Sequence, residues 1–300
     1  MHKFPFVTVD VFSSRALEGN PVAVFTDARG LSDADMQAIA LETRLSETTF
    51  IIPRDEATER ADGVMVRIFT VAEELPFAGH PTLGTASVVA HARHVTEVAL
   101  DLKVGRIPIS FKAAPDGLFG EMTQRDPEFG KIHDADEIAR ATGIPLSELD
   151  TSIPIQTVST GFAFAIVPLR SLVTLGKLQI DLAKAYEYLA TTDARQFYFI
   201  TRDTNGEAAL RARMFFYGGE DPATGSAAGC TAAWMVRLAV AKSDEQVIIA
   251  QGIEMKRPSR IFVRASIDGA RVHNVRVGGY CAEVMRGELM LPDSALSCAS

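Results

Sequence analysis

Two eight-residue stretches, 141 residues apart, are near copies of each other, and this repetition constrains the fold more than any other feature of the chain. Gly79–Ala86 and Glu220–Ala227 share, from their second residue on, a polar residue, Pro, two further residues, Gly, a hydroxyl residue and Ala. Each follows an Arg–apolar–Phe segment, and each opens an alanine-rich run. The pair predicts an internal duplication in which a strand leads into a helix in each half.

Both motifs are suited to holding a small anion at the start of a helix. Proline is favoured in a first helical turn, because its missing N–H has no partner there anyway. A nearby glycine lets a ligand approach the backbone closely, and the free N–H groups attract negative charge. A titratable side chain, His80 or Asp221, stands directly before each proline. One such helix start in each half predicts a single small-molecule site between two similar lobes.

The segments around the motifs repeat as well. The motif helices are predicted at about 82–94 and 223–239, beginning at Pro81 and Pro222. The second helix carries small side chains on every side, which suits a helix surrounded by sheet. After each helix the sequence predicts the same strand, turn and strand. These strands are expected at 98–104 and 107–112 in the first half and at 246–251 and 260–265 in the second.

The length of 300 residues favours two domains. We predict an N-terminal lobe at 1–118 and a C-terminal lobe at 119–300, with the last strand, about 287–300, packing on the first lobe. Three strands are expected between about 260 and 291. A separate helix is predicted from Ser32, where Asp35 completes an acidic variant of the capping box.

Composition excludes several classes of function. Hydrophobic residues make up 47% of the chain and charged residues 23%, which is ordinary for a globular protein. A net charge of −8 argues against nucleic-acid partners, since these require basic patches. No apolar run is long enough to cross a membrane, and the N-terminal residues lack the apolar core of a signal peptide. We therefore expect a cytoplasmic protein with neither nucleic-acid nor membrane partners.

Cofactor and metal signatures are missing from the sequence. Its three cysteines are too scattered for a disulfide framework, and its six histidines show no metal-ligand spacing. No glycine-rich nucleotide-binding loop opens a helix. The sequence therefore predicts no cofactor and no metal.

Several motifs, taken in order along nearly the whole chain, resemble the PhzF-like (phenazine-biosynthesis) family, within the broader diaminopimelate-epimerase-like fold. The resemblance implies an α+β fold with two pseudo-symmetric lobes. Each lobe would be a curved, mostly antiparallel, barrel-like sheet wrapped around one central helix, with the active site in the cleft between the lobes. The motifs are Val9–Phe12, Gly19–Pro21, Leu45–Thr48, Gly79–Gly84, Ser159–Gly161, Glu220–Ala227, Gln251–Gly252, Arg257–Ser259 and Val277–Gly279.

The resemblance also implies roles for individual residues. Glu47 corresponds to the family's catalytic acid and base, while His80 and Asp221 correspond to catalytic-site residues that bind and orient the substrate. The epimerase relatives carry cysteines at the positions of His80 and Asp221, so their absence here argues against racemisation by two thiols. Glu42 and Glu73 are competing carboxylates that fall in no motif. Residues expected to line the substrate site are Asn20, Gly79, Gly225 and Ser226.

The chemistry is reasonable on its own terms. Moving a proton between carbons needs one base that can return what it takes, with a pKa near the working pH, and burial in a cleft raises the pKa of a carboxylate. We predict a cofactor-independent isomerase that shifts a proton on a small carboxylate-bearing substrate, and we expect a homodimer. The alternatives are an amino-acid epimerase or racemase that uses one carboxylate, and a non-catalytic protein that binds a small ligand.

Overall fold

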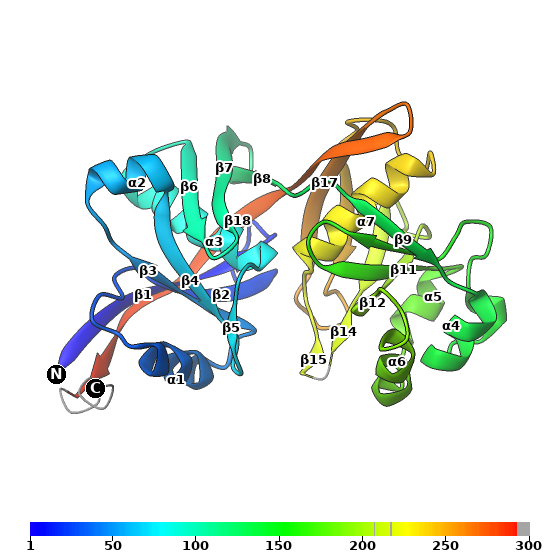
Figure 1. Cartoon of the computed structure of the whole chain (residues 1–300), viewed down its shortest axis with the longest axis horizontal. Helices are drawn as coiled ribbons and strands as arrows, with labels where there is room; N and C mark the ends of the chain where they lie inside the picture. Colours follow the sequence, from blue (N-terminus) through cyan, green and yellow to red (C-terminus); the bar gives the residue numbers. More distant parts are fainter. Residues whose placement is uncertain (207, 217, 293–300) are drawn as a thin grey trace. The chain divides into compact units, whose positions relative to one another are not determined.

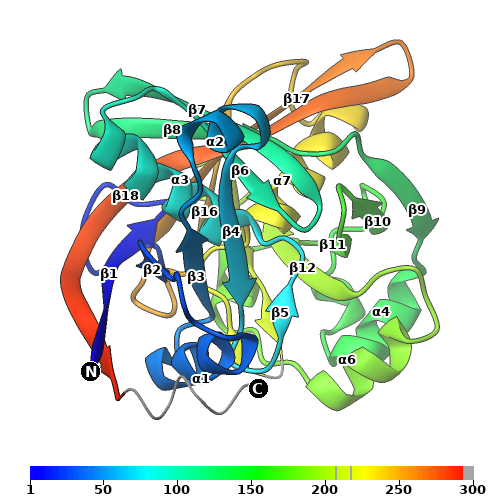
Figure 2. The same ribbon diagram turned by 60° about the vertical axis from the view of Figure 1, so that its left-hand side comes forward.

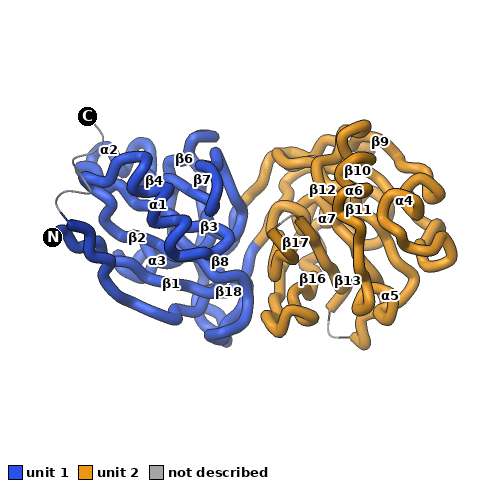
Figure 3. Tube along the Cα trace, turned by 90° about the horizontal axis from the view of Figure 1, so that it is seen from below, with its two compact units in different colours: residues 1–122, 278–300 blue, residues 123–277 orange. Residues whose placement is uncertain are grey.

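The computed structural model describes residues 1–206, 208–216 and 218–292, and it shows an α+β fold, as predicted. The chain divides into two compact units (Figure 3). Among the described residues, unit 1 contains Met1–Met122 and those from Gly278 to Pro292, and unit 2 contains those between Thr123 and Val277. The predicted boundary at 118/119 lies inside strand β8 (Gly117–Thr123).

Unit 1 is built on a closed sheet of eight strands. The strands pair in the order β1-β2-β3-β4-β6-β7-β8-β18, and β18 pairs again with β1 to close the ring (Figures 1 and 2). The elements of this unit are β1 (His2–Val11), β2 (Asn20–Phe25), α1 (Asp33–Thr43), β3 (Glu47–Ile52), α2 (Glu56–Asp62), β4 (Val64–Phe69), β5 (Glu74–Leu75), α3 (Gly79–Arg93), β6 (Glu97–Leu102), β7 (Gly105–Ala114), β8 and the latter part of β18 (Arg271–Leu291).

Helix α3 packs directly against this sheet, and the first eight residues of the helix are all buried. A methyl group added at Gly84 would lie 2.7 Å from a methyl carbon of Val22 and 2.8 Å from one of Val11. Close packing of helix on sheet at this density leaves no room for a side chain. The glycine of the first motif is therefore required by the distance between α3 and strands β1 and β2.

Unit 2 contains an open sheet in the order β9-β10-β11-β12-β13-β16-β17-β18, with β9 at its edge. Helix α7 is buried along almost its whole length, as its small residues predicted. The elements are β9 (Glu128–Ile132), α4 (Ala135–Thr142), a 3-10 turn (Leu146–Glu148), β10 (Gln156–Ser159), β11 (Ala163–Leu169), α5 (Leu172–Gly176), α6 (Leu182–Leu189), β12 (Gln196–Thr201), β13 (Leu210–Arg213), β14 (Phe215–Phe216), β15 (Gly219–Glu220), α7 (Gly225–Arg237), β16 (Val247–Gln251) and β17 (Ser259–Asp268).

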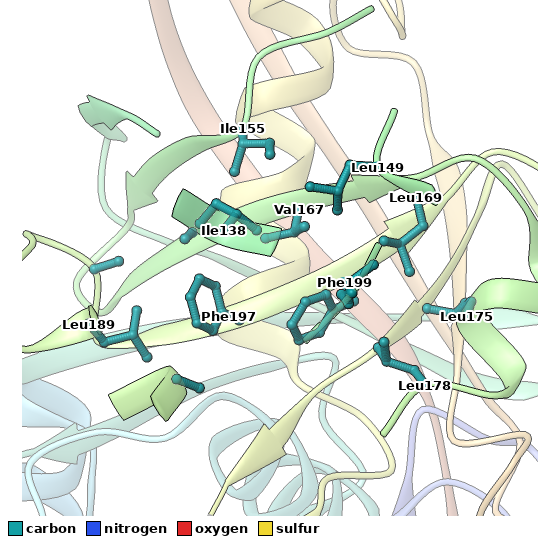
Figure 4. Close-up of a cluster of buried hydrophobic side chains, with 14 residues drawn as sticks. Ile138, Leu149, Ile155, Val167, Leu169, Leu175, Leu178, Leu189, Phe197 and Phe199 are labelled. Atoms are coloured by element: carbon teal, nitrogen blue, oxygen red, sulfur yellow. The ribbon is translucent and has the colours of Figure 1, made fainter. Parts of the chain in front are cut away.

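A hydrophobic cluster stabilises the part of unit 2 where helices α4, α5 and α6 pack on strands β11 and β12 (Figure 4). Phe197 and Phe199 of β12 lie among aliphatic side chains of the neighbouring elements, including Val167 and Leu175. Alternate residues of a strand point to the same face, so the two phenylalanine side chains both lie on the face of the sheet that packs against the helices. Their ring centroids lie 5.7 Å apart.

The two units repeat the same order of strand pairing. From β1 to β7 the successive pairs are antiparallel, parallel, antiparallel, parallel and antiparallel. From β10 to β17 the five pairs follow that same order. The duplication inferred from the motifs is thus present in the sheet topology. The units differ in that the sheet of unit 1 closes through β18 and β1, whereas β9 is an edge strand that pairs only with β10 among the described residues.

Two predicted helix starts and one predicted number of strands were wrong. Helix α3 begins at Gly79, before Pro81, whereas α7 begins at Gly225, after Pro222, so equivalent motif positions enter the helix five residues apart. Among the described residues, two strands, not three, follow residue 258, because β18 continues through Gly278. That glycine does not turn the chain. It allows close packing, since an added methyl would lie 2.6 Å from the Gly120 carbonyl oxygen.

Among the described residues, no helix has both the length and the apolar character needed to cross a membrane.

Candidate active site

Glu47 lies at the first position of strand β3, beside the start of β2. Strands β2 and β3 run parallel, with Val22 opposite Glu47, so Asn20 at the beginning of β2 comes to the same end of the sheet. Helix α3 contacts both strands and places His80 in its first turn. Asn20, Glu47 and His80, three of the predicted site residues, are thereby brought together, although Asn20 and His80 are 60 residues apart in the sequence.

Burial sets the protonation of Glu47. Its side chain is 16% exposed, and removal from water raises the pKa of its carboxyl to about 7, against a hydrogen bond from Ser46 that lowers it. A carboxylate loses solvation on burial, so the neutral form is favoured. Its Oε2 atom is buried and accepts no hydrogen bond within the described part of the chain. Near neutral pH, Glu47 therefore exists in both protonation states.

The hydrogen bonds of His80 define which ring nitrogen carries the proton. The Asn20 amide nitrogen lies 3.2 Å from His80 Nδ1, and the Ser46 hydroxyl oxygen lies 3.4 Å from the Asn20 carbonyl oxygen. An amide nitrogen can only donate, so Nδ1 accepts and the neutral ring carries its proton on Nε2. That nitrogen lies 3.4 Å from Glu47 Oε2. The protonated nitrogen is therefore the one nearer to the Glu47 carboxyl, although the two groups do not form a hydrogen bond.

The two motif helices start differently from the other α-helices of the described chain. In helices α1, α2, α4, α5 and α6 a backbone N–H of the first turn donates a hydrogen bond to the side chain of the N-cap residue. Helices α3 and α7, with Ala78 and Thr224 at the N-cap, have no such bond. Their first-turn N–H groups are thus not occupied by a capping side chain, and a helix N-terminus of this kind favours an anion.

In unit 2, Asp221 lies in the turn between β15 and α7, just ahead of Gly225 and Ser226. Its Oδ2 accepts a hydrogen bond of 2.6 Å from the Thr224 hydroxyl, and its backbone N–H donates to the Met214 carbonyl at 3.0 Å. The N-cap residue is Thr224, so Asp221 does not itself cap α7.

Two arginine–glutamate clamps, not recognised from the sequence, lie at the entry to the motifs: Glu74 precedes the first motif, and Glu220 is the first residue of the second. Arg67 binds Glu74 through Nε at 2.8 Å and Nη2 at 2.7 Å, and Arg213 binds Glu220 through the same atoms at 2.8 Å each. Each arginine also stacks on the phenylalanine two residues later. Each glutamate lies seven residues after its arginine, and this repeated spacing is the sequence feature from which the clamps could have been predicted.

The remaining predictions can be placed residue by residue. Gly79 is the first residue of α3 and is buried next to His80. The competing carboxylates Glu42 and Glu73 are both exposed, which distinguishes them from Glu47. Sequence reasoning assigned no role to Ser46 or Gln251, although both fall in the quoted motifs. Within the described residues, no group of His, Cys, Asp and Glu is arranged to hold a metal ion.

Comparison with known proteins gives consistent matches over the whole length. Residues 9–287 match the family described as "Phenazine biosynthesis-like protein". A trans-2,3-dihydro-3-hydroxyanthranilate isomerase of Pseudomonas aeruginosa is 34% identical, covering 97% of this chain and 100% of the relative. An uncharacterised isomerase of Mesorhizobium japonicum is 32% identical, covering 95% and 98%. A crystal structure of a Bacillus anthracis protein of the PhzF family aligns with a TM-score of 0.84 at 25% identity, covering 97% and 100%. These names agree with the predicted isomerase class.

Proposed function

The chain belongs to the phenazine biosynthesis-like family, and from this premise we propose that it is an isomerase that moves a proton within a small carboxylate-bearing metabolite. Glu47 is the proposed acid and base. The observation that carries the proposal is the buried carboxyl of Glu47, whose pKa is raised to about 7. General acid–base catalysis is most efficient when the pKa lies near the working pH.

The proposed reaction balances without an electron donor or acceptor. The ionised Glu47 takes a proton from one carbon, and the electron pair of the broken C–H bond delocalises into the unsaturated substrate. The same carboxyl then returns the proton to a different carbon. Because atoms and electrons are conserved, this proton shift requires no redox cofactor, and we propose that none is used.

Charge that develops on the substrate needs fixed donors. The His80 Nε2–H and the N–H groups at the start of α3 are such donors, since they are held by the protein before the reaction begins. Asp221 is suited to the opposite partner. As a carboxylate it would repel an anion and accept a hydrogen bond from an amine or hydroxyl.

These requirements describe a substrate with a carboxylate and a nearby amine or hydroxyl, on a single ring or a short chain. The compound named for the Pseudomonas relative, trans-2,3-dihydro-3-hydroxyanthranilate, has this composition. We propose the same chemical class for this chain. The proposal also includes a homodimer in the cytoplasm, neither nucleic-acid nor membrane partners, and substrate contacts from Asn20, Gly79, Gly225 and Ser226.

The test is incubation of the purified protein with trans-2,3-dihydro-3-hydroxyanthranilate, followed by ultraviolet absorption and NMR. We expect loss of the substrate diene and formation of an isomer of unchanged mass. A parallel panel of amino acids in deuterated water addresses the epimerase alternative, because epimerisation exchanges the α-hydrogen. Exchange in that panel with no turnover of the dihydroanthranilate would replace the proposed function by amino-acid epimerisation.

A further inference from the structure

Gln251, at the end of β16, is completely buried and uses its whole side-chain amide. Its Nε2 donates to the Asp221 carbonyl at 2.7 Å and to the Thr224 hydroxyl at 3.0 Å. Its Oε1 accepts from the Thr224 backbone N–H at 3.1 Å and from the Tyr198 hydroxyl at 2.9 Å. A glutamine amide offers two donors and two acceptor positions, so none is left over.

These bonds fix the direction of every proton between Tyr198 and Asp221. The Thr224 N–H can only donate and the Asp221 carbonyl can only accept, so the amide oxygen must face the first and the amide nitrogen the second. A flipped amide would lose both of these bonds. The Thr224 hydroxyl accepts from Gln251, and its own proton is thereby directed to Asp221 Oδ2, 2.6 Å away. The carboxylate is thus held by a chain of bonds that starts at a fully buried tyrosine.

The next residue, Gly252, allows the close contact between the end of β16 and the turn that carries Asp221. Gly252 has φ +76, and a methyl group added there would lie 2.5 Å from the Pro222 carbonyl oxygen and 2.4 Å from that of Arg257. Any side chain would push β16 away from the turn that carries Asp221. The Gln251–Gly252 motif therefore has one physical explanation: its glutamine binds this turn and its glycine allows the approach.

We propose that Gln251 is a positioning residue, which orients the Asp221 carboxylate toward the substrate through Thr224. The proposal rests on the proposed function, in which Asp221 contacts the substrate. It adds that the geometry of Asp221 depends on two amide N–H donors.

Gln251→Glu tests this directly, because it keeps the shape of the side chain and the acceptors for Tyr198 and the Thr224 N–H but removes both donors. The new carboxylate also competes for the Thr224 hydroxyl proton. We expect kcat/KM for trans-2,3-dihydro-3-hydroxyanthranilate to fall about 10- to 100-fold, the range expected for a misplaced site group. The matched control is Gln156→Glu, on another buried glutamine of unit 2 whose amide donates to Gly130. It should change kcat/KM less than about twofold.

A second readout does not depend on turnover. NMR scalar couplings report the χ1 rotamer of Asp221, which should be single in the unmodified protein and in Gln156→Glu but averaged in Gln251→Glu. If the unmodified protein shows no turnover, the proposed function fails while the rotamer measurement still decides the role of Gln251. A single Asp221 rotamer in the folded Gln251→Glu protein would overturn the inference.

Tyr198→Phe covers the case in which Gln251→Glu does not fold. It removes one donor to Oε1 and keeps the buried ring. We expect a fall in kcat/KM of about threefold, with partial averaging of the Asp221 rotamer, since one of four bonds is lost. A Tyr198→Phe protein with unchanged kinetics and an unchanged rotamer would contradict the chain of bonds.

Discussion

Glu47 illustrates how a single residue can exchange stability for function. Strand β3 holds its carboxyl away from water, and the raised pKa shows that the folded protein favours the protonated form. When the group ionises at higher pH, a buried charge remains in the folded state. The property proposed to make Glu47 a base near neutral pH therefore also makes it a source of instability.

This gives a pH-dependent prediction for the free energy of unfolding. The carboxyl pKa rises from 4.5 to about 7 on folding, so the stability linked to the neutral form is present below pH 4.5 and is lost as the pH rises through 7. The difference corresponds to at most about 3 kcal/mol. Glu47→Gln stays neutral, so its stability relative to the unmodified protein should increase between pH 5 and pH 8. Urea unfolding at both pH values measures this, and a constant difference would show that Glu47 is not desolvated.

Residues of the site were predictable where the family resemblance covered them, and their physical state was not. The sequence places Glu47, His80 and Asn20 in three separate motifs, but the proton on His80 Nε2 follows from a bond between residues 60 positions apart. The raised pKa likewise depends on packing that no local pattern contains. Sequence supplied the residue types, and tertiary contacts supplied their protonation.

At the scale of elements, each clamp joins two strands: Arg67 connects β4 to β5, and Arg213 connects β13 to β15. Arg213 is the more enclosed, since its Nη1 also donates to the carbonyls of Leu175, Gly176 and Leu178. Its partner Glu220 directly precedes Asp221. Because both charges are mostly buried, with side-chain exposures of 9% and 13%, the pair is sensitive to loss of either member.

We predict that Arg213→Met destabilises the protein by about 3–5 kcal/mol, because it leaves Glu220 as an uncompensated buried charge. The matched control is Lys3→Met, which breaks an exposed pair with Glu288 and should leave the free energy of unfolding nearly unchanged. Unfolding in urea measures both variants. Equal effects of the two substitutions would mean that the clamp does not stabilise the β13–β15 region.

The starts of the two motif helices could not be predicted from the local sequence. A proline in the first turn was expected for both motif helices, yet α7 begins only after Pro222. The Thr224 N–H is bound by Gln251, so the backbone before Gly225 pairs with a side chain instead of entering the helix. In the first motif, Thr82 N–H donates to the Ala78 carbonyl and the helix begins earlier. Distant partners, not the motif itself, decide each start.

For the whole molecule, the duplication was visible in sequence and the closure of unit 1 was not. The repeated motifs predicted repeated strands, and the pairing order of the two units matches. Closure depends on β18 pairing with β1, for example Leu291 with His2, across nearly the whole chain. Such register is set by side-chain packing on both faces of the sheet, which a short motif does not specify.

The most direct test of the account follows deuterium during turnover of trans-2,3-dihydro-3-hydroxyanthranilate in deuterated water. With Glu47 as the acid and base, the unmodified protein should place deuterium at the carbon that receives the proton, because the carboxyl exchanges with solvent. Folded Glu47→Gln should bind the same compound but lose at least about 10²-fold in kcat, within the range for loss of a general acid–base group. Turnover by Glu47→Gln at the rate of the unmodified protein, with the same deuterium incorporation, would contradict the central claim.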